Sequence, residues 1–70
     1  MSAGLPIEVD PEIMSGIPVF TGTRVPVDSL FDYLIKGSSL DEFLDCFPTV
    51  RRADALVILE HSKHEIASAA

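Results

Sequence analysis

A short segment between residues 16 and 27, GIPVFTGTRVPV, constrains the fold of this chain more than any other feature. β-Branched and aromatic residues flank the turn-prone TGT at positions 21–23, which predicts a β-hairpin. Pro18 and Pro26 lack the N–H that a central strand donates, so both arms must be edge strands or strand ends. Because a lone two-stranded hairpin is marginally stable in water, this one must pack on helices, pair with a second subunit, or do both.

The length of the chain also argues for assembly. The chain has 70 residues, and a domain of this size buries only roughly 60% of the surface of its unfolded state. Cys46 is the only cysteine, so no disulfide within the chain can add stability, yet 47% of the residues are apolar. We therefore expect a homodimer that buries part of this apolar surface, with Val19, Phe20 and Val25 of the hairpin as contact residues.

The composition predicts a cytoplasmic protein that does not enter a membrane. A single thiol suits a reducing compartment. No apolar run reaches the ~18 residues of a membrane span, and the first residues lack the basic region of a signal peptide. Eleven acidic residues against five basic ones give a net charge of −6. Proteins whose main task is to bind phosphates usually carry the opposite charge.

The apolar pattern predicts a mainly α fold in a single domain. Residues 1–6 are expected to form a flexible lead-in, residues 7–27 a short β-hairpin or extended arm, and residues 28–67 a three-helix core. Within the arm, the alternation of apolar and acidic residues at positions 7–9 predicts a short strand.

The first two helices have clear start and stop signals. Apolar residues recur at i, i+3, i+4, i+7 and i+8 from Val27, which predicts an amphipathic helix over about residues 28–36 with Gly37 just past its end. Ser39 and Glu42 have the spacing of a capping box for a short second helix. Pro48 ends that helix.

The third helix is expected over about residues 50–67, with Thr49 as its N-cap. If the helix positions that face the core are counted from Val50 at helical spacing, Leu56 and Val57 lie in the core. Ile58 and Leu59 then lie on a second face, which we expect to contact a partner. The predicted core consists of Leu30, Phe31, Leu34, Phe43, Leu44, Phe47, Leu56 and Val57.

The lengths of the three helices are those of a homeodomain-like unit that contains a helix-turn-helix. Only Pro48 and Thr49 separate the second helix from the third. Such a unit places candidate DNA contacts at Arg51 and Arg52, with Lys36 as a third cation. The two arginines could equally pair with Asp45, Asp54 or other neighbouring acids.

Residues 7–65 carry a specific combination of motifs. An Asp-Pro turn, SGIPVFTGTRVPV, a helix written VDSLFDYLIKG and then SLDEFLDCFPTVRR follow one another in this order. The chain closely resembles the domain-of-unknown-function family 433. This resemblance implies homeodomain-like, antitoxin-type proteins that are often encoded beside a toxin with a PIN-type nuclease fold.

One segment departs from the family pattern. After FPTV such sequences usually continue with a polar turn of the Ser-Arg-Glu-Gln kind, whereas residues 51–54 here read RRAD. Arg52 keeps the basic position and Arg51 adds a charge. A second arginine at the start of a recognition helix favours contacts with phosphates or bases.

Two classes of function follow from these observations. The first is the antitoxin of a type II toxin–antitoxin system, which neutralises a PIN-like ribonuclease by direct binding and weakly binds its own operator. The second is a small helix-turn-helix transcriptional regulator without a toxin partner. Arg24 could contact a carboxylate of the partner, or it could tie the hairpin to Asp28 or Asp32.

Other chemistry is sparse in this sequence. His61 and His64 are three residues apart but have no third ligand at a fixed spacing, so we expect no metal site. Cys46 lies next to Asp45, and an acidic neighbour raises the pKa of a thiol, so we expect a partly buried filler rather than a nucleophile. No catalytic constellation or phosphate-binding loop has supporting context, which predicts a non-enzymatic protein without a cofactor.

Overall fold

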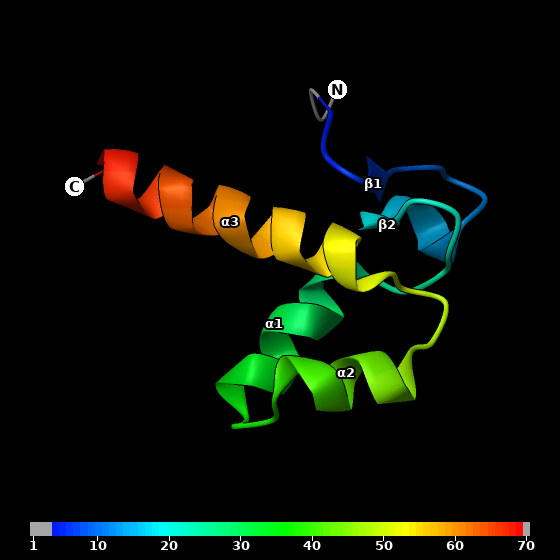
Figure 1. Cartoon of the computed structure of the whole chain (residues 1–70). Helices are drawn as coiled ribbons and strands as arrows, with labels where there is room; N and C mark the ends of the chain where they lie inside the picture. Colours follow the sequence, from blue (N-terminus) through cyan, green and yellow to red (C-terminus); the bar gives the residue numbers. More distant parts are fainter. Residues whose placement is uncertain (1–3, 70) are drawn as a thin grey trace.

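The computed structural model describes residues 4–69. Two short strands precede three helices, and a short 3-10 turn lies between the strands (Figure 1). In chain order the elements are β1 (Ile7–Glu8), η1 (Met14–Gly16), β2 (Val19–Phe20), α1 (Val27–Ile35), α2 (Leu40–Cys46) and α3 (Arg52–Ala69). This confirms the predicted mainly α fold with short antiparallel strands at its beginning.

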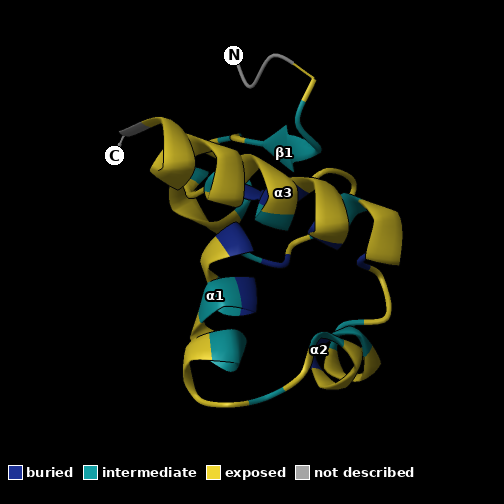
Figure 2. Cartoon of the chain, turned by 60° about the vertical axis from the view of Figure 1, so that its left-hand side comes forward, coloured by how far each residue is buried: buried dark blue, intermediate teal, exposed yellow. Residues whose placement is uncertain are grey.

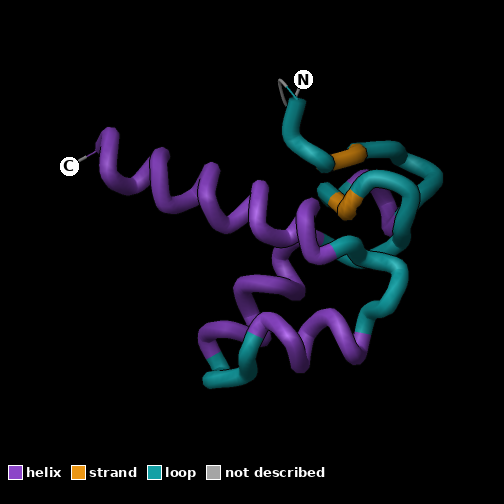
Figure 3. The backbone as a smooth tube through the Cα atoms, in the orientation of Figure 1, coloured by secondary structure: helices purple, strands orange, loops and turns teal. Residues whose placement is uncertain are grey.

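β1 and β2 pair with each other and form a two-stranded sheet (Figure 3). Ile7 lies opposite Phe20 in an antiparallel register. The predicted hairpin is present beside this pair, but it is reduced to one bridge between Val19 and Pro26. The N–H of Phe20 donates to the carbonyl of Val25 over 3.0 Å. Pro26 has no N–H to donate, which limits the ladder on this side of β2.

The segment before β1 is anchored where the structure describes it. Residues 1–3 of the predicted flexible lead-in lie outside the described residues. Leu5 packs against the hydrophobic core, and the N–H of Thr21 donates to the carbonyl of Pro6 over 3.1 Å. These contacts hold Leu5 and Pro6 beside the body of the molecule, and the flexibility of the lead-in stays a prediction.

Local signals place the ends of α1 and α2 as predicted. Gly37 has a φ of +96°, its N–H donates to Leu34, and the N–H of Ser38 donates to Tyr33. These two bonds make a Schellman motif, for which glycine is favoured because it adopts a positive φ without strain. The capping box is also confirmed, since the hydroxyl of Ser39 accepts the N–H of Glu42 over 3.1 Å and the carboxylate of Glu42 accepts the N–H of Ser39 over 2.7 Å.

The core gathers where β2, α1, α2 and α3 meet (Figure 2). Phe43 of α2 is fully buried, and its ring centroid lies 6.2 Å from that of Phe20, 5.4 Å from Tyr33 and 5.0 Å from Phe47. Tilted and edge-on aromatic pairs of this kind add stability beyond the area they bury. The buried apolar residues are Val19, Phe20, Val25, Val27, Leu30, Phe43, Val50, Ala55 and Ile58.

The inward face of α3 differs from the prediction. Ala55 and Ile58 are buried, whereas Leu56 and Val57 are 45% and 43% exposed. The prediction counted helical spacing from Val50, but α3 begins only at Arg52. Val50 is buried from the preceding loop, so the stripe counted from it has the wrong phase. Thr49, three residues before the helix, is not its N-cap.

The predicted dimer contacts are also corrected. Val19 and Phe20 are fully buried within a single chain, and Val25 is 9% exposed. Side chains that fill the core of one chain cannot also contact a second subunit. A homodimer stays a prediction, and its contacts must come from other residues. Within residues 4–69, no helix is both long and apolar enough to cross a membrane.

Candidate functional site

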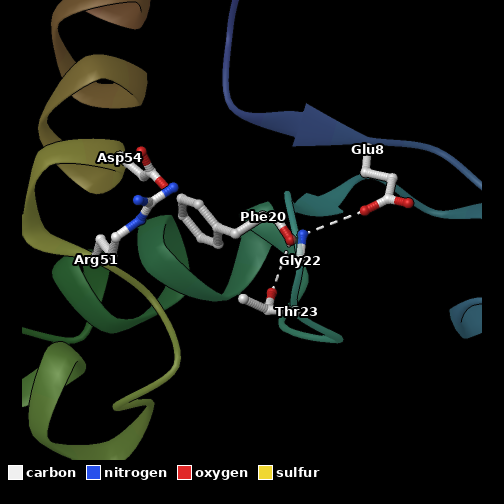
Figure 4. A network of polar contacts seen from close by, with 6 residues as sticks. All are labelled: Glu8, Phe20, Gly22, Thr23, Arg51 and Asp54. Carbon is white, nitrogen blue, oxygen red and sulfur yellow. Dashed lines mark hydrogen bonds and ion pairs between the residues drawn. The ribbon is translucent and has the colours of Figure 1, made fainter.

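The turn that follows β2 is held rigidly by its own hydrogen bonds (Figure 4). The hydroxyl of Thr23 donates to the carbonyl of Phe20 over 2.8 Å and accepts the N–H of Val25 over 3.0 Å. The N–H of Gly22 donates to Oε1 of Glu8 over 3.2 Å, which fixes the turn to β1. Gly22 has a φ of +77°, a conformation that favours glycine at this position of the turn.

An open groove of about 780 Å³ lies beside this turn. Four segments form its walls: β1, the region of η1, the turn itself, and the connection from α2 to α3. Most of its lining is apolar. The lining residues are Glu8, Ile13, Met14, Gly22, Thr23, Arg24, Val25, Pro26, Phe47 and Thr49.

The backbone at the edge of this groove is strained. Met14 and Ser15 have φ angles of +51° and +60°, which residues other than glycine adopt at a cost. Met14 is also 44% exposed while it lines the groove. Strained backbone of this kind gathers at binding and catalytic sites, where the surrounding structure maintains it.

Among the residues that the structure describes, Arg24 is the only cation that lines the groove. The predicted tie to Asp28 or Asp32 is wrong, because within residues 4–69 no carboxylate pairs with the guanidinium of Arg24. The other prediction, contact with a partner's carboxylate, remains open. An exposed, unpaired guanidinium beside an apolar wall can bind a carboxylate through two parallel hydrogen bonds.

The two arginines at the start of α3 are paired with acids. Nε of Arg51 lies 3.4 Å from Oδ2 of Asp54 (Figure 4), and Arg52 contacts Asp41 of α2. Pairing with a neighbouring acid was the alternative to DNA contact, and the structure contains such pairs. Lys36, the third candidate DNA contact, follows α1, and Figure 1 shows the α1–α2 turn well apart from the start of α3. The three candidate DNA contacts therefore come from two places in the fold, the end of α1 and the start of α3.

Three large apolar residues of α3 remain exposed among the described residues. Leu56 and Val57 are nearly half exposed, and Ile66 is 73% exposed on the part of α3 that extends past the body of the molecule (Figure 1). Ile58, predicted as a partner contact, is instead 3% exposed, and Leu59 packs against the core. The excess of apolar residues in this helix predicts an exposed apolar face. The run from Ala55 to Leu59 is apolar throughout, however, so the sequence does not show which of these residues face the solvent.

The single cysteine and the histidines form no reactive site in the described residues. Cys46 is exposed, which corrects its prediction as a partly buried filler. A hydrogen bond with the Cys46 side chain raises the pKa of the Tyr33 phenol above its ordinary value of 10.0, and desolvation adds to this effect. His61 lies 4.0 Å from Glu65, and within residues 4–69 no three metal-ligating side chains gather.

A family model described as "Protein of unknown function (DUF433)" matches residues 7–61. The chain belongs to the DUF433 family. No curated protein matches the chain.

A solved DUF433 structure has the same fold. The crystal structure of a DUF433 member protein from Anabaena variabilis ATCC 29413, at 2.00 Å resolution, superposes on this chain with a TM-score of 0.72 and 23% sequence identity. The match covers 94% of this chain and 65% of that protein, so this DUF433 chain spans slightly less than two thirds of the other's length. At this identity the likeness establishes the fold.

Proposed function

We propose that this DUF433 protein is the antitoxin of a type II toxin–antitoxin pair and neutralises a PIN-like ribonuclease by direct binding. The observation that carries the proposal is the uncovered apolar surface of α3. Leu56 and Val57 are 45% and 43% exposed, although the core is complete without them. We call these two residues the outer face of α3.

An apolar face on a projecting helix suits a protein partner. Protein interfaces derive most of their affinity from a few apolar anchors that become fully desolvated. Leu56 and Val57 supply two adjacent anchors near the body of the molecule. Ile66 is also exposed, but at 3.6 residues per turn it lies on the opposite side of α3 from Val57 and belongs to another surface. The proposed partner contacts are therefore these two anchors, in place of Ile58 and Leu59, which were predicted as partner contacts from the sequence.

The charge of the chain supports a basic partner. Its net charge is −6, and a ribonuclease must attract the phosphates of RNA with a positively charged surface. Opposite charges accelerate the encounter of two proteins, while buried apolar contacts set the affinity. An acidic antitoxin with apolar anchors combines both effects.

A DNA-binding regulator is the second candidate. Arg51 and Arg52 both stand in or next to the first turn of α3. Their guanidinium groups are exposed, and the pair of Arg52 with Asp41 is exposed on both sides. Exposed pairs are weak, so phosphates could displace the carboxylates. Few such contacts give a shallow salt dependence, with a log–log slope of roughly −0.9 per phosphate. We propose that operator binding is weak for the protein alone and stronger once a basic toxin joins the complex.

Growth rescue tests the proposed function. The protein encoded by the adjacent reading frame is expressed alone, with the wild-type chain, and with a variant in which Leu56 and Val57 are both replaced by Asp. The matched control is Ile35→Asp, because Ile35 is 81% exposed and lies on α1. Circular dichroism of each variant verifies that it folds.

We expect the neighbour to be toxic alone and harmless with the wild type or with Ile35→Asp. Toxicity should return with the double variant, because two buried carboxylates without partners destroy an apolar contact. A harmless neighbour, or toxicity that co-expression leaves unchanged, contradicts the antitoxin function and favours the DNA-binding regulator.

A further inference from the structure

We propose that the groove beside the Gly22–Pro26 turn receives an extended segment of the protein partner in which a carboxylate side chain stands next to apolar residues. The carboxylate binds Arg24, and the apolar neighbours lie on the wall of the groove. This inference rests on the proposed protein-binding function and deepens it, because it states the chemistry of the segment that this DUF433 chain recognises.

Within residues 4–69 the guanidinium of Arg24 has no carboxylate partner. The chain has eleven acidic and five basic residues, so carboxylates are in excess. Arg51 and Arg52 each have a carboxylate partner, yet within the described residues Arg24 has none. The backbone N–H of Arg24 also lacks a partner there. A missing ion pair in an acid-rich chain reflects the position of this arginine rather than a shortage of acids.

Glu8, the one acid in the lining, does not fill this role. Its Oε1 accepts the N–H of Gly22, and no ion pair joins its carboxylate to Arg24. Glu8 therefore holds the turn in place, and the guanidinium stays free for an incoming carboxylate.

Apolar side chains surround Arg24 in the groove. Ile13, Met14, Val25, Pro26 and Phe47 line the same groove. An apolar segment that covers them excludes water from the guanidinium. A charge-assisted hydrogen bond is stronger where water is excluded. The ligand that matches both features carries an acid directly beside apolar side chains.

A phosphate backbone fits this groove poorly. Proteins bind nucleic acid through several cations along one track, whereas Arg24 is the one cation in this lining. The net charge of −6 and the nearby Glu8 repel a polyanion. A single carboxylate on an otherwise apolar segment experiences much less of this repulsion.

The turn is organised before the ligand arrives. Thr23 and Gly22 are already held by hydrogen bonds to Phe20 and Glu8, so the backbone of residues 22–26 need not be ordered on binding. Binding to a pre-organised site avoids part of the entropy cost of association.

Peptide titration tests the inference on the full chain. One probe is a short capped peptide with a single glutamate between leucines, and its twin has glutamine in place of the glutamate. Amide chemical shifts in nitrogen–proton correlation spectra report where each peptide binds. We expect shifts at residues 22–25 and binding of the glutamate peptide about tenfold tighter than that of its twin, as a charge-assisted contact provides.

Variants locate the preference. Arg24→Gln should abolish the tenfold difference, and Arg24→Lys should retain part of it, because lysine keeps the charge but loses the two-pronged geometry. The control Lys36→Gln removes an exposed cation outside the groove and should leave the difference unchanged. Equal binding of the twin peptides, a preference that survives Arg24→Gln, or tighter binding of a short oligonucleotide to residues 22–25 would each overturn the inference.

The peptide result and the growth-rescue result are independent. If the wild type rescues growth but shows no glutamate preference, the groove inference fails and the antitoxin function stands. If the preference is present and depends on Arg24 while no rescue occurs, the recognition chemistry stands and the antitoxin function fails.

Discussion

A matched pair of alanine substitutions on α3 tests which side of this helix faces the core. Ile58 is 3% exposed and Leu56 is 45% exposed, although both are large apolar residues in the same turn. Ile58→Ala deletes three buried carbons, which at about 0.8 kcal/mol each amounts to roughly 2.4 kcal/mol of lost transfer free energy. The cavity left behind raises the expected loss to about 2.5–4 kcal/mol.

That loss is large for this chain. At about 0.05–0.15 kcal/mol per residue, a protein of 70 residues has a free energy of unfolding of roughly 3.5–10 kcal/mol. For a domain of this size, each kcal/mol lowers the melting temperature by about 4–8 °C. Ile58→Ala should therefore melt at least about 10 °C below the wild type.

Leu56→Ala is the control. Its side chain already contacts water, so we expect a loss near or below about 1 kcal/mol. Urea denaturation followed by circular dichroism at constant m-value measures both variants. An equal loss for the two variants, or a larger loss for Leu56→Ala, would refute the assignment of the inward face.

Three further perturbations test local features. Ser39→Ala removes one half of the capping box and should cost about 0.5–2 kcal/mol in a urea melt; an unchanged midpoint would contradict its role. A Cβ added at Gly22 meets no atom within 4 Å, but Gly22→Ala forces an alanine to a φ of +77°, so we expect a loss of about 1–2 kcal/mol from conformation alone. Tyr33 is the only tyrosine and the chain has no tryptophan, so absorbance near 295 nm titrates this phenol alone. The pKa of the Tyr33 phenol is raised in the folded protein, so this phenol should deprotonate at a higher pH in the folded protein than in the chain in urea. Cys46→Ala should reduce the difference between these two pKa values. The associated stability is present below the unfolded pKa and is lost as the pH rises through the folded pKa.

Features set by neighbouring residues could be predicted from the sequence. The end of α1 at Gly37 and the capping box of α2 depend on hydrogen bonds between residues only three to five positions apart. Such contacts form in the same way wherever their motif occurs. The order of the elements followed from the apolar periodicity and the turn signals, and the structure confirms it.

Features set by distant residues could not be predicted. The pairing of Ile7 with Phe20 and the contact of Arg52 with Asp41 both join separate elements. The inward face of α3 depended on where the helix begins, because a run of five apolar residues has no period of its own. The groove required η1, the turn and the α2–α3 connection to meet, so its apolar lining could not be assembled from the sequence.

Stoichiometric inhibition of the purified partner tests the central claim most directly. The product of the adjacent reading frame is assayed for cleavage of a fluorescent RNA while this DUF433 protein is added in increasing amounts. If this chain is an antitoxin, RNA cleavage should fall linearly and cease near one equivalent of binding sites, and the Leu56/Val57 double Asp variant should leave cleavage largely intact. Full cleavage in the presence of excess folded wild-type protein would contradict the claim.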